Sequence, residues 1–99
     1  MTVNIQSVKF DADQKLVERI QKKLQKLTTF HDRIINVDVF LRLDNVAHTI
    51  KDKTVGIRIT VPNQQLFVEN SSKSFELSFE NAFDSICNQV KKQKQKIAA

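Results

Sequence analysis

The chain has 99 residues, of which 40% are hydrophobic and 27% are charged, and its net charge is +5. This is enough chain for one modest hydrophobic core, and no apolar run approaches the roughly 20 residues that span a bilayer. One cysteine, one glycine and one proline exclude an internal disulfide, a collagen-like repeat and a linker-rich architecture. We therefore expect a single soluble domain over residues 1–99, located in the cytoplasm and without a signal peptide.

The N-terminal part of the chain predicts a strand followed by an amphipathic helix. Polar and apolar residues alternate over positions 2–6, as in a half-buried strand. Asp11 and Gln14 resemble a capping box, in which the first side chain accepts backbone donors of the first helical turn. Apolar residues then recur at helical spacing up to about Phe30: Leu16, Val17, Ile20, Leu24 and Leu27.

The middle of the chain predicts three further strands. A period of two runs from Ile34 to Leu43 and returns over residues 55–61, with apolar side chains on one face only. Residues 44–53 between them are polar, and we expect a solvated loop there. Pro62 and Asn63 predict a tight turn, because proline presets the first φ and asparagine tolerates a positive one. A final short strand over residues 65–69 follows.

The C-terminal part of the chain predicts a second, longer helix. After a connection over residues 70–73, Ser74 is the expected N-cap, and an apolar stripe then runs from Phe75 to Ile97. The element order is β-α-β-β-β-α, in which the first two strands are parallel and the later ones antiparallel. We predict an α+β, two-layer sandwich with a four-stranded mixed sheet and both helices on one face, similar to double-stranded-RNA-binding domains.

Two basic stretches stand out against a mildly acidic remainder. Residues 15–26 hold five cations and one acid, Glu18, and residues 91–96 hold four lysines and no acid. This distribution indicates a surface that binds a polyanion, although lysines that merely solubilise exposed helix faces would give the same pattern. The candidate RNA-binding residues are Lys15, Arg19, Lys22, Lys23, Lys26, Lys91, Lys92, Lys94 and Lys96.

The sequence gives little support to catalysis, a cofactor or a metal site. His31 and His48 fall in predicted loops, and Cys87 beside an apolar stripe is expected to be a partly buried, inert thiol. These residues do not have zinc-ligand spacing. Three carboxylates repeat every four residues along the second helix and are interpreted as a solvated face: Glu76, Glu80 and Asp84. We expect no enzyme, no small-molecule substrate and no membrane partner.

Phe40 and Phe67 are predicted on the open face of the sheet, where three roles are possible. They could stack RNA bases, as in RNA-recognition motifs, although the order of elements differs from that family. They could equally cover part of the sheet or form a weak dimer contact. A small interaction protein that uses its open sheet edge is a further possibility for the whole chain.

Several segments, taken in this order and at this spacing, resemble one protein family over nearly the whole length of the chain. They are Val3–Ser7, Phe10–Ala12, Leu16–Leu27, Ile57–Pro62, Leu66–Val68, Ser74–Glu76, Ala82–Ile86 and Gln89–Lys96. With them the chain resembles short members of the ribosome hibernation-promoting factor family, also called ribosome-associated inhibitor A. The resemblance implies a protein that binds small-subunit RNA in the mRNA and tRNA channel and silences ribosomes under stress, with the basic residues above facing that RNA. A generic RNA-binding module is the alternative.

The chain departs from the family pattern at two places. Asn63 stands where the family usually has glycine, and an aromatic residue common near Gln93 is absent, which could weaken stacking on a base. Long members of the family add a C-terminal dimerisation domain. Because this chain stops at Ala99, we expect any pairing of ribosomes to need another factor.

Overall fold

The computed structural model describes residues 2–8, 10–31, 33–47 and 50–98. Its elements are β1 (Thr2–Val8), α1 (Gln14–Phe30), β2 (Asn36–Ala47), β3 (Ile50–Val61), β4 (Gln64–Ser72) and α2 (Phe75–Ala98). The order β-α-β-β-β-α is the predicted one. Neither α1 nor α2 is both long and apolar enough to cross a membrane.

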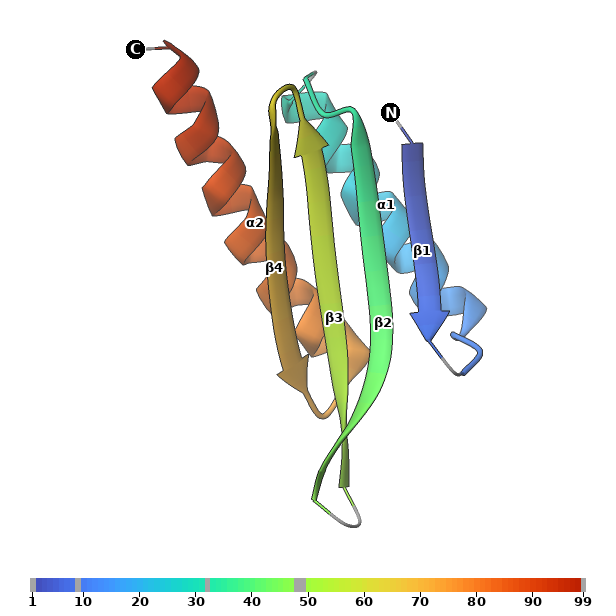
Figure 1. Cartoon of the computed structure of the whole chain (residues 1–99). Helices are drawn as coiled ribbons and strands as arrows, with labels where there is room; N and C mark the ends of the chain where they lie inside the picture. The colour runs from blue at the N-terminus through green and yellow to red at the C-terminus, as the bar shows by residue number, and fades with distance from the viewer. Residues whose placement is uncertain (1, 9, 32, 48–49, 99) are drawn as a thin grey trace.

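The four strands form one mixed sheet in the order β1-β2-β3-β4. β1 runs parallel to β2, whereas β2 with β3 and β3 with β4 are antiparallel. Figure 1 shows both helices behind the sheet, so that the opposite face of the sheet has no helix over it. The predicted α+β sandwich with two helices on one face is therefore confirmed.

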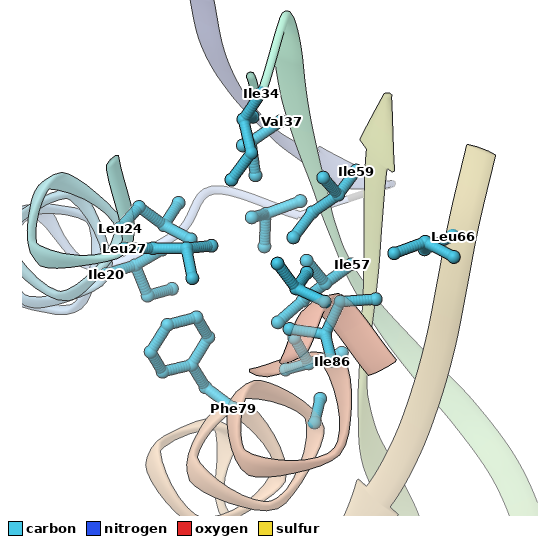
Figure 2. Packing of buried hydrophobic residues seen from close by; sticks show 14 of the residues in the cluster. Ile20, Leu24, Leu27, Ile34, Val37, Ile57, Ile59, Leu66, Phe79 and Ile86 are labelled. Carbon is cyan, nitrogen blue, oxygen red and sulfur yellow. The ribbon is translucent and has the colours of Figure 1, made fainter. Parts of the chain in front are cut away.

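The hydrophobic core lies between the sheet and the helices, as Figure 2 shows. Side chains alternate along each strand, so one face supplies the core and the other meets solvent. The fully enclosed core residues come from every element except β1 and β4: Ile20, Leu24, Val37, Val39, Leu41, Val55, Ile57, Ile59 and Ile86. Val3 and Ile5 of β1 are only half-buried against them, as expected at a sheet edge.

The two helix starts show one correct and one wrong prediction. Ser74 caps α2 as expected, since its hydroxyl accepts from the backbone N–H of Leu77 at 3.1 Å. The predicted cap at Asp11 is wrong, because α1 is capped by Asp13, whose carboxylate accepts from Lys15 N at 3.1 Å. Asp13 has the extended backbone that an N-cap requires, and two aspartates so close together give the same local pattern.

The turn at Pro62–Asn63 is confirmed, with Asn63 at φ 66°, a conformation that asparagine tolerates better than most residues. The loop predicted over residues 44–53 is wrong, because β2 continues to Ala47 and β3 begins at Ile50. The described part of this hairpin reaches beyond the other strands at the lower end of Figure 1. β4 likewise extends to Ser72, into the predicted connection.

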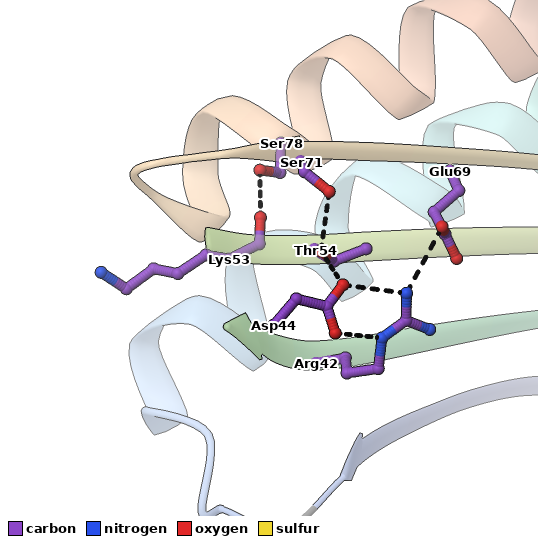
Figure 3. A network of polar contacts seen from close by, with 7 residues as sticks. All are labelled: Arg42, Asp44, Lys53, Thr54, Glu69, Ser71 and Ser78. Atoms are coloured by element: carbon purple, nitrogen blue, oxygen red, sulfur yellow. Dashed lines mark hydrogen bonds and ion pairs between the residues drawn. The ribbon is translucent and has the colours of Figure 1, made fainter. Parts of the chain in front are cut away.

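Polar contacts stabilise the extended end of the hairpin where the core no longer reaches it (Figure 3). Thr54 on β3 donates to the Asp44 carboxylate on β2 at 2.8 Å, and its hydroxyl lies 2.7 Å from that of Ser71 on β4. The buried Ser78 hydroxyl of α2 donates to the Lys53 carbonyl oxygen. These contacts tie β2, β3, β4 and α2 together without apolar side chains.

Candidate nucleic-acid interface

The basic residues of α1 form one continuous surface beside the buried stripe of the helix. Leu16, Ile20, Leu24 and Leu27 face the core, and the cations follow along the flank that is turned toward α2. A shallow depression of about 300 Å³ lies on this flank. It is lined by Lys15, Glu18, Arg19, Lys22, Lys23 and Lys26, which we call the α1 basic face.

The cations of the α1 basic face divide into two groups. Lys23 Nζ lies 3.0 Å from Glu80 Oε2 on α2, and Arg19 Nη2 lies 3.9 Å from Glu80 Oε1. Lys23 also lies 5.7 Å from the centre of the Phe83 ring. Glu80, which was predicted on a solvated face, is thus half-buried between the helices and links them by ion pairs.

The second group projects without a carboxylate partner. Within the described parts of the chain, no ion pair involves the side chains of Lys15, Lys22 or Lys26, and all three are exposed. An ammonium group on a flexible stem adapts to a phosphate in many orientations. These three residues therefore give α1 the chemistry of a phosphate-binding surface.

The basic residues of α2 lie toward its C-terminal end, which extends past the sheet at the upper left of Figure 1. Lys91 and Lys92 are exposed. The side chains of Lys94 and Lys96 lie outside the described residues, although α2 itself continues to Ala98. Since the helices share one face of the sheet, both basic stretches belong to the helical side of the molecule.

The open face of the sheet carries a different set of groups. Phe40 on β2 is half-buried and Phe67 on β4 is 52% exposed, so both lie on this face as predicted. Arg42 on β2 pairs with Asp44 at 2.7 Å and with Glu69 at 3.4 Å (Figure 3). The hydrogen bond to Asp44 is the main cause that raises the pKa of Arg42, and the same bond, aided by Thr54, lowers the pKa of Asp44.

Among the described residues, the remaining candidate groups show no catalytic arrangement. Cys87 is half-buried on α2, and burial is the main cause that raises its pKa, so the thiol is protonated at neutral pH. His31 ends α1 by donating its backbone N–H to the Leu27 carbonyl oxygen, and His48 lies outside the described residues. Among the described side chains, no group of three or more histidine, cysteine or carboxylate residues could hold a metal ion.

The ion pair of Lys23 with Glu80 was missed at the level of sequence. The two residues are 57 positions apart, and only the packing of α1 beside α2 brings them together. A weak signal existed, because Glu80 lies one helical turn before Phe83 at the edge of the apolar stripe, where an acid can meet a partner from another helix.

Comparison with known proteins gives one family and a set of similar folds. A model of the family described as sigma 54 modulation protein / S30EA ribosomal protein matches residues 3–98. A ribosomal subunit interface protein from Coxiella burnetii superposes with a TM-score of 0.84 at 18% identity, covering 96% of this chain and 99% of that one. The N-terminal domain of Thermus thermophilus Protein Y gives 0.73 at 20% identity, covering 91% and 93%. No curated protein matches the chain.

Proposed function

Because the chain belongs to the sigma 54 modulation protein / S30EA ribosomal protein family, we propose that it is a ribosome-associated translation inhibitor. It binds small-subunit ribosomal RNA in the channel used by mRNA and tRNA and silences ribosomes during stress or stationary phase. It works in the cytoplasm, where ribosomes are, and makes or breaks no covalent bond.

The α1 basic face carries this proposal. Three lysines on one exposed flank, without carboxylate partners among the described residues, make a surface suited to a phosphate backbone. Lys91 and Lys92 extend the positive charge along α2, and Lys94 and Lys96 are proposed to continue it. The names of two proteins with similar folds, a ribosomal subunit interface protein and Protein Y, agree with a ribosomal site.

The proposed mechanism is steric occlusion held by electrostatics. Lysines that replace condensed counterions on ribosomal RNA release those ions, and this release drives binding at low and moderate salt. Most contacts would reach phosphates, which fix position and carry little sequence information. Specificity for one channel would then follow from the shape of the folded RNA, and the bound domain would exclude mRNA and tRNA by its volume.

Co-sedimentation of the purified chain with small ribosomal subunits across a salt series tests the proposal, with an unstructured RNA of matched length as the comparison. We expect binding at one chain per subunit that persists at salt concentrations where the free RNA has been released. If the chain binds the subunits and the unstructured RNA equally well, and salt releases it from both alike, a specific ribosomal site is contradicted. The chain would then be a generic basic RNA-binding domain.

A further inference from the structure

Two phenylalanines approach the same glycine on the sheet face that no helix covers. Phe40 on β2 and Phe67 on β4 both lean over Gly56 on β3, since a Cβ at position 56 would lie 3.3 Å from Phe67 Cζ and 3.8 Å from Phe40 Cδ2. The Arg58 guanidinium lies over the Phe40 ring, 5.3 Å from its centre, in a cation–π contact. Phe67 is left half-exposed. We call these four residues the aromatic patch.

The arginines around the aromatic patch are already neutralised. Arg58 Nη2 lies 3.0 Å from Asp38 Oδ2, and this carboxylate is itself almost enclosed by the sheet. Arg42 is held by Asp44 and by Glu69 (Figure 3). Both guanidinium groups therefore have carboxylate partners before any ligand arrives.

The charge balance of this face disfavours nucleic acid. Asp52 pairs in register with Asp44 and shares its face, so four carboxylates accompany two guanidinium groups at the described outward positions of β2, β3 and β4. A phosphate backbone that stacked its bases on Phe67 would meet net negative charge and, among the outward residues that the structure describes, no unpaired cation. Among the described residues, the unpaired lysines of α1 lie on the helical side of the molecule, whereas carboxylates outnumber guanidinium groups on the sheet side.

We propose that the aromatic patch is a protein-binding surface, and that its occupant is a lysine- or arginine-bearing segment of a ribosomal protein. This inference rests on the proposed function. A cation placed over the open face of Phe67 gains a cation–π contact. Glu69 lies two residues along on the same face of β4, and because Asp44 also neutralises Arg42, the charge of Glu69 is partly available to that cation. Proteins that lie on ribosomal RNA carry such basic segments because they neutralise phosphates. The chain would then contact RNA through its helices and protein through its sheet.

Photo-cross-linking on purified small subunits tests this assignment. The full chain with Phe67→p-benzoylphenylalanine is bound to subunits, irradiated, and the linked partner is identified by mass spectrometry. We expect a cross-link to a ribosomal protein within a segment that contains lysine or arginine. The matched control is Glu18→p-benzoylphenylalanine on the α1 basic face, which should link to RNA. A cross-link from position 67 to RNA alone, to a protein segment without cations, or to nothing would overturn the inference.

Affinity measurements with Phe67→Ser and Phe67→Tyr provide the second test, since position 67 is half-exposed and neither change empties the core. Phe67→Ser should weaken binding to small subunits about threefold to tenfold, whereas Phe67→Tyr should retain it, because only the serine variant lacks a ring for the cation. Equal affinity of all three chains would overturn the inference and leave the proposed function standing. If the wild-type chain itself fails to bind subunits, both fall.

Discussion

Lys23 Nζ on α1 lies 3.0 Å from Glu80 Oε2 on α2, and this ion pair is the closest polar contact described between the two helices. Both side chains are about one-third exposed, and the second Glu80 oxygen lies 3.9 Å from Arg19. The carboxylate therefore neutralises part of the α1 basic face in the free protein. A phosphate that binds there must compete with it for the same two cations.

Replacing Glu80 should tighten RNA binding. Glu80→Gln leaves Arg19 and Lys23 without their carboxylate, and since such a half-exposed pair is worth at most about 1 kcal/mol, affinity for small subunits should rise about twofold to fivefold. The matched control is Glu76→Gln, which makes the same charge change on the first turn of α2 without an ion pair among the described residues. An equal gain in both variants, measured by co-sedimentation at one salt concentration, would contradict a local role for Glu80.

Removing single lysines from the α1 basic face should lower the salt dependence of binding. For Lys22→Ala and Lys26→Ala, the slope of log affinity against log salt should fall by about 0.7–0.9 for each phosphate that the variant no longer neutralises. Lys73→Ala is the charge-matched control, because Lys73 is exposed in the connection between β4 and α2. If Lys73→Ala lowers the slope as much as Lys22→Ala, net charge and not the α1 basic face controls binding.

Adding a methyl group at Gly56 should stabilise the sheet slightly. The backbone of Gly56 does not need a positive φ, so Gly56→Ala reduces the freedom of the unfolded chain and should add about 0.4–1 kcal/mol to the free energy of unfolding. The new Cβ would approach Phe67 Cζ to 3.3 Å, and the half-exposed ring can swing outward to relieve this. Urea denaturation measures the change. A urea midpoint below that of the wild-type chain would contradict this prediction, because it would show that the Phe67 ring cannot move aside.

The hairpin carboxylate Asp44 should contribute to acid sensitivity. Its hydrogen bonds from Arg42 and Thr54 lower its pKa, so its contribution to stability is complete above the ordinary carboxyl pKa of about 3.9 and is lost as pH falls below that value. Asp44→Asn should therefore destabilise the protein more at pH 7 than at pH 3, measured as the urea midpoint. Asp11→Asn, at an exposed position before α1, should give no such difference. A deficit for Asp44→Asn that is equal at both pH values would contradict this assignment.

The sequence predicts a helix or strand correctly where one face of that element is apolar. It does not predict the strand ends that have no apolar face. Leu41 and Val55 belong to a clear period of two because they line the core, whereas residues 44–47 and 50–53 extend past it and show no alternation of apolar and polar residues. Those strands pair through their backbones and through contacts such as Thr54 with Asp44, which leave no periodic signal.

In the candidate site, too, the features set by a single element could be predicted from the sequence, and those set by packing between elements could not. The basic stripe of α1 is visible in the sequence, because its residues recur along one helix. The partner of Lys23 is not visible, because it depends on how α2 packs beside α1. The strand pattern likewise shows Gly56 only as an outward position, and its role under Phe40 and Phe67 emerges once three strands are in register.

Competition on the small ribosomal subunit tests the central claim most directly. Subunits saturated with the labelled chain are challenged with mRNA together with initiator tRNA, and the chain that remains bound is measured at fixed salt. Occlusion of the channel predicts that the two ligands displace the chain in a concentration-dependent manner. A chain that stays bound at full occupancy of mRNA and tRNA would contradict the account, because its site would then lie outside the channel.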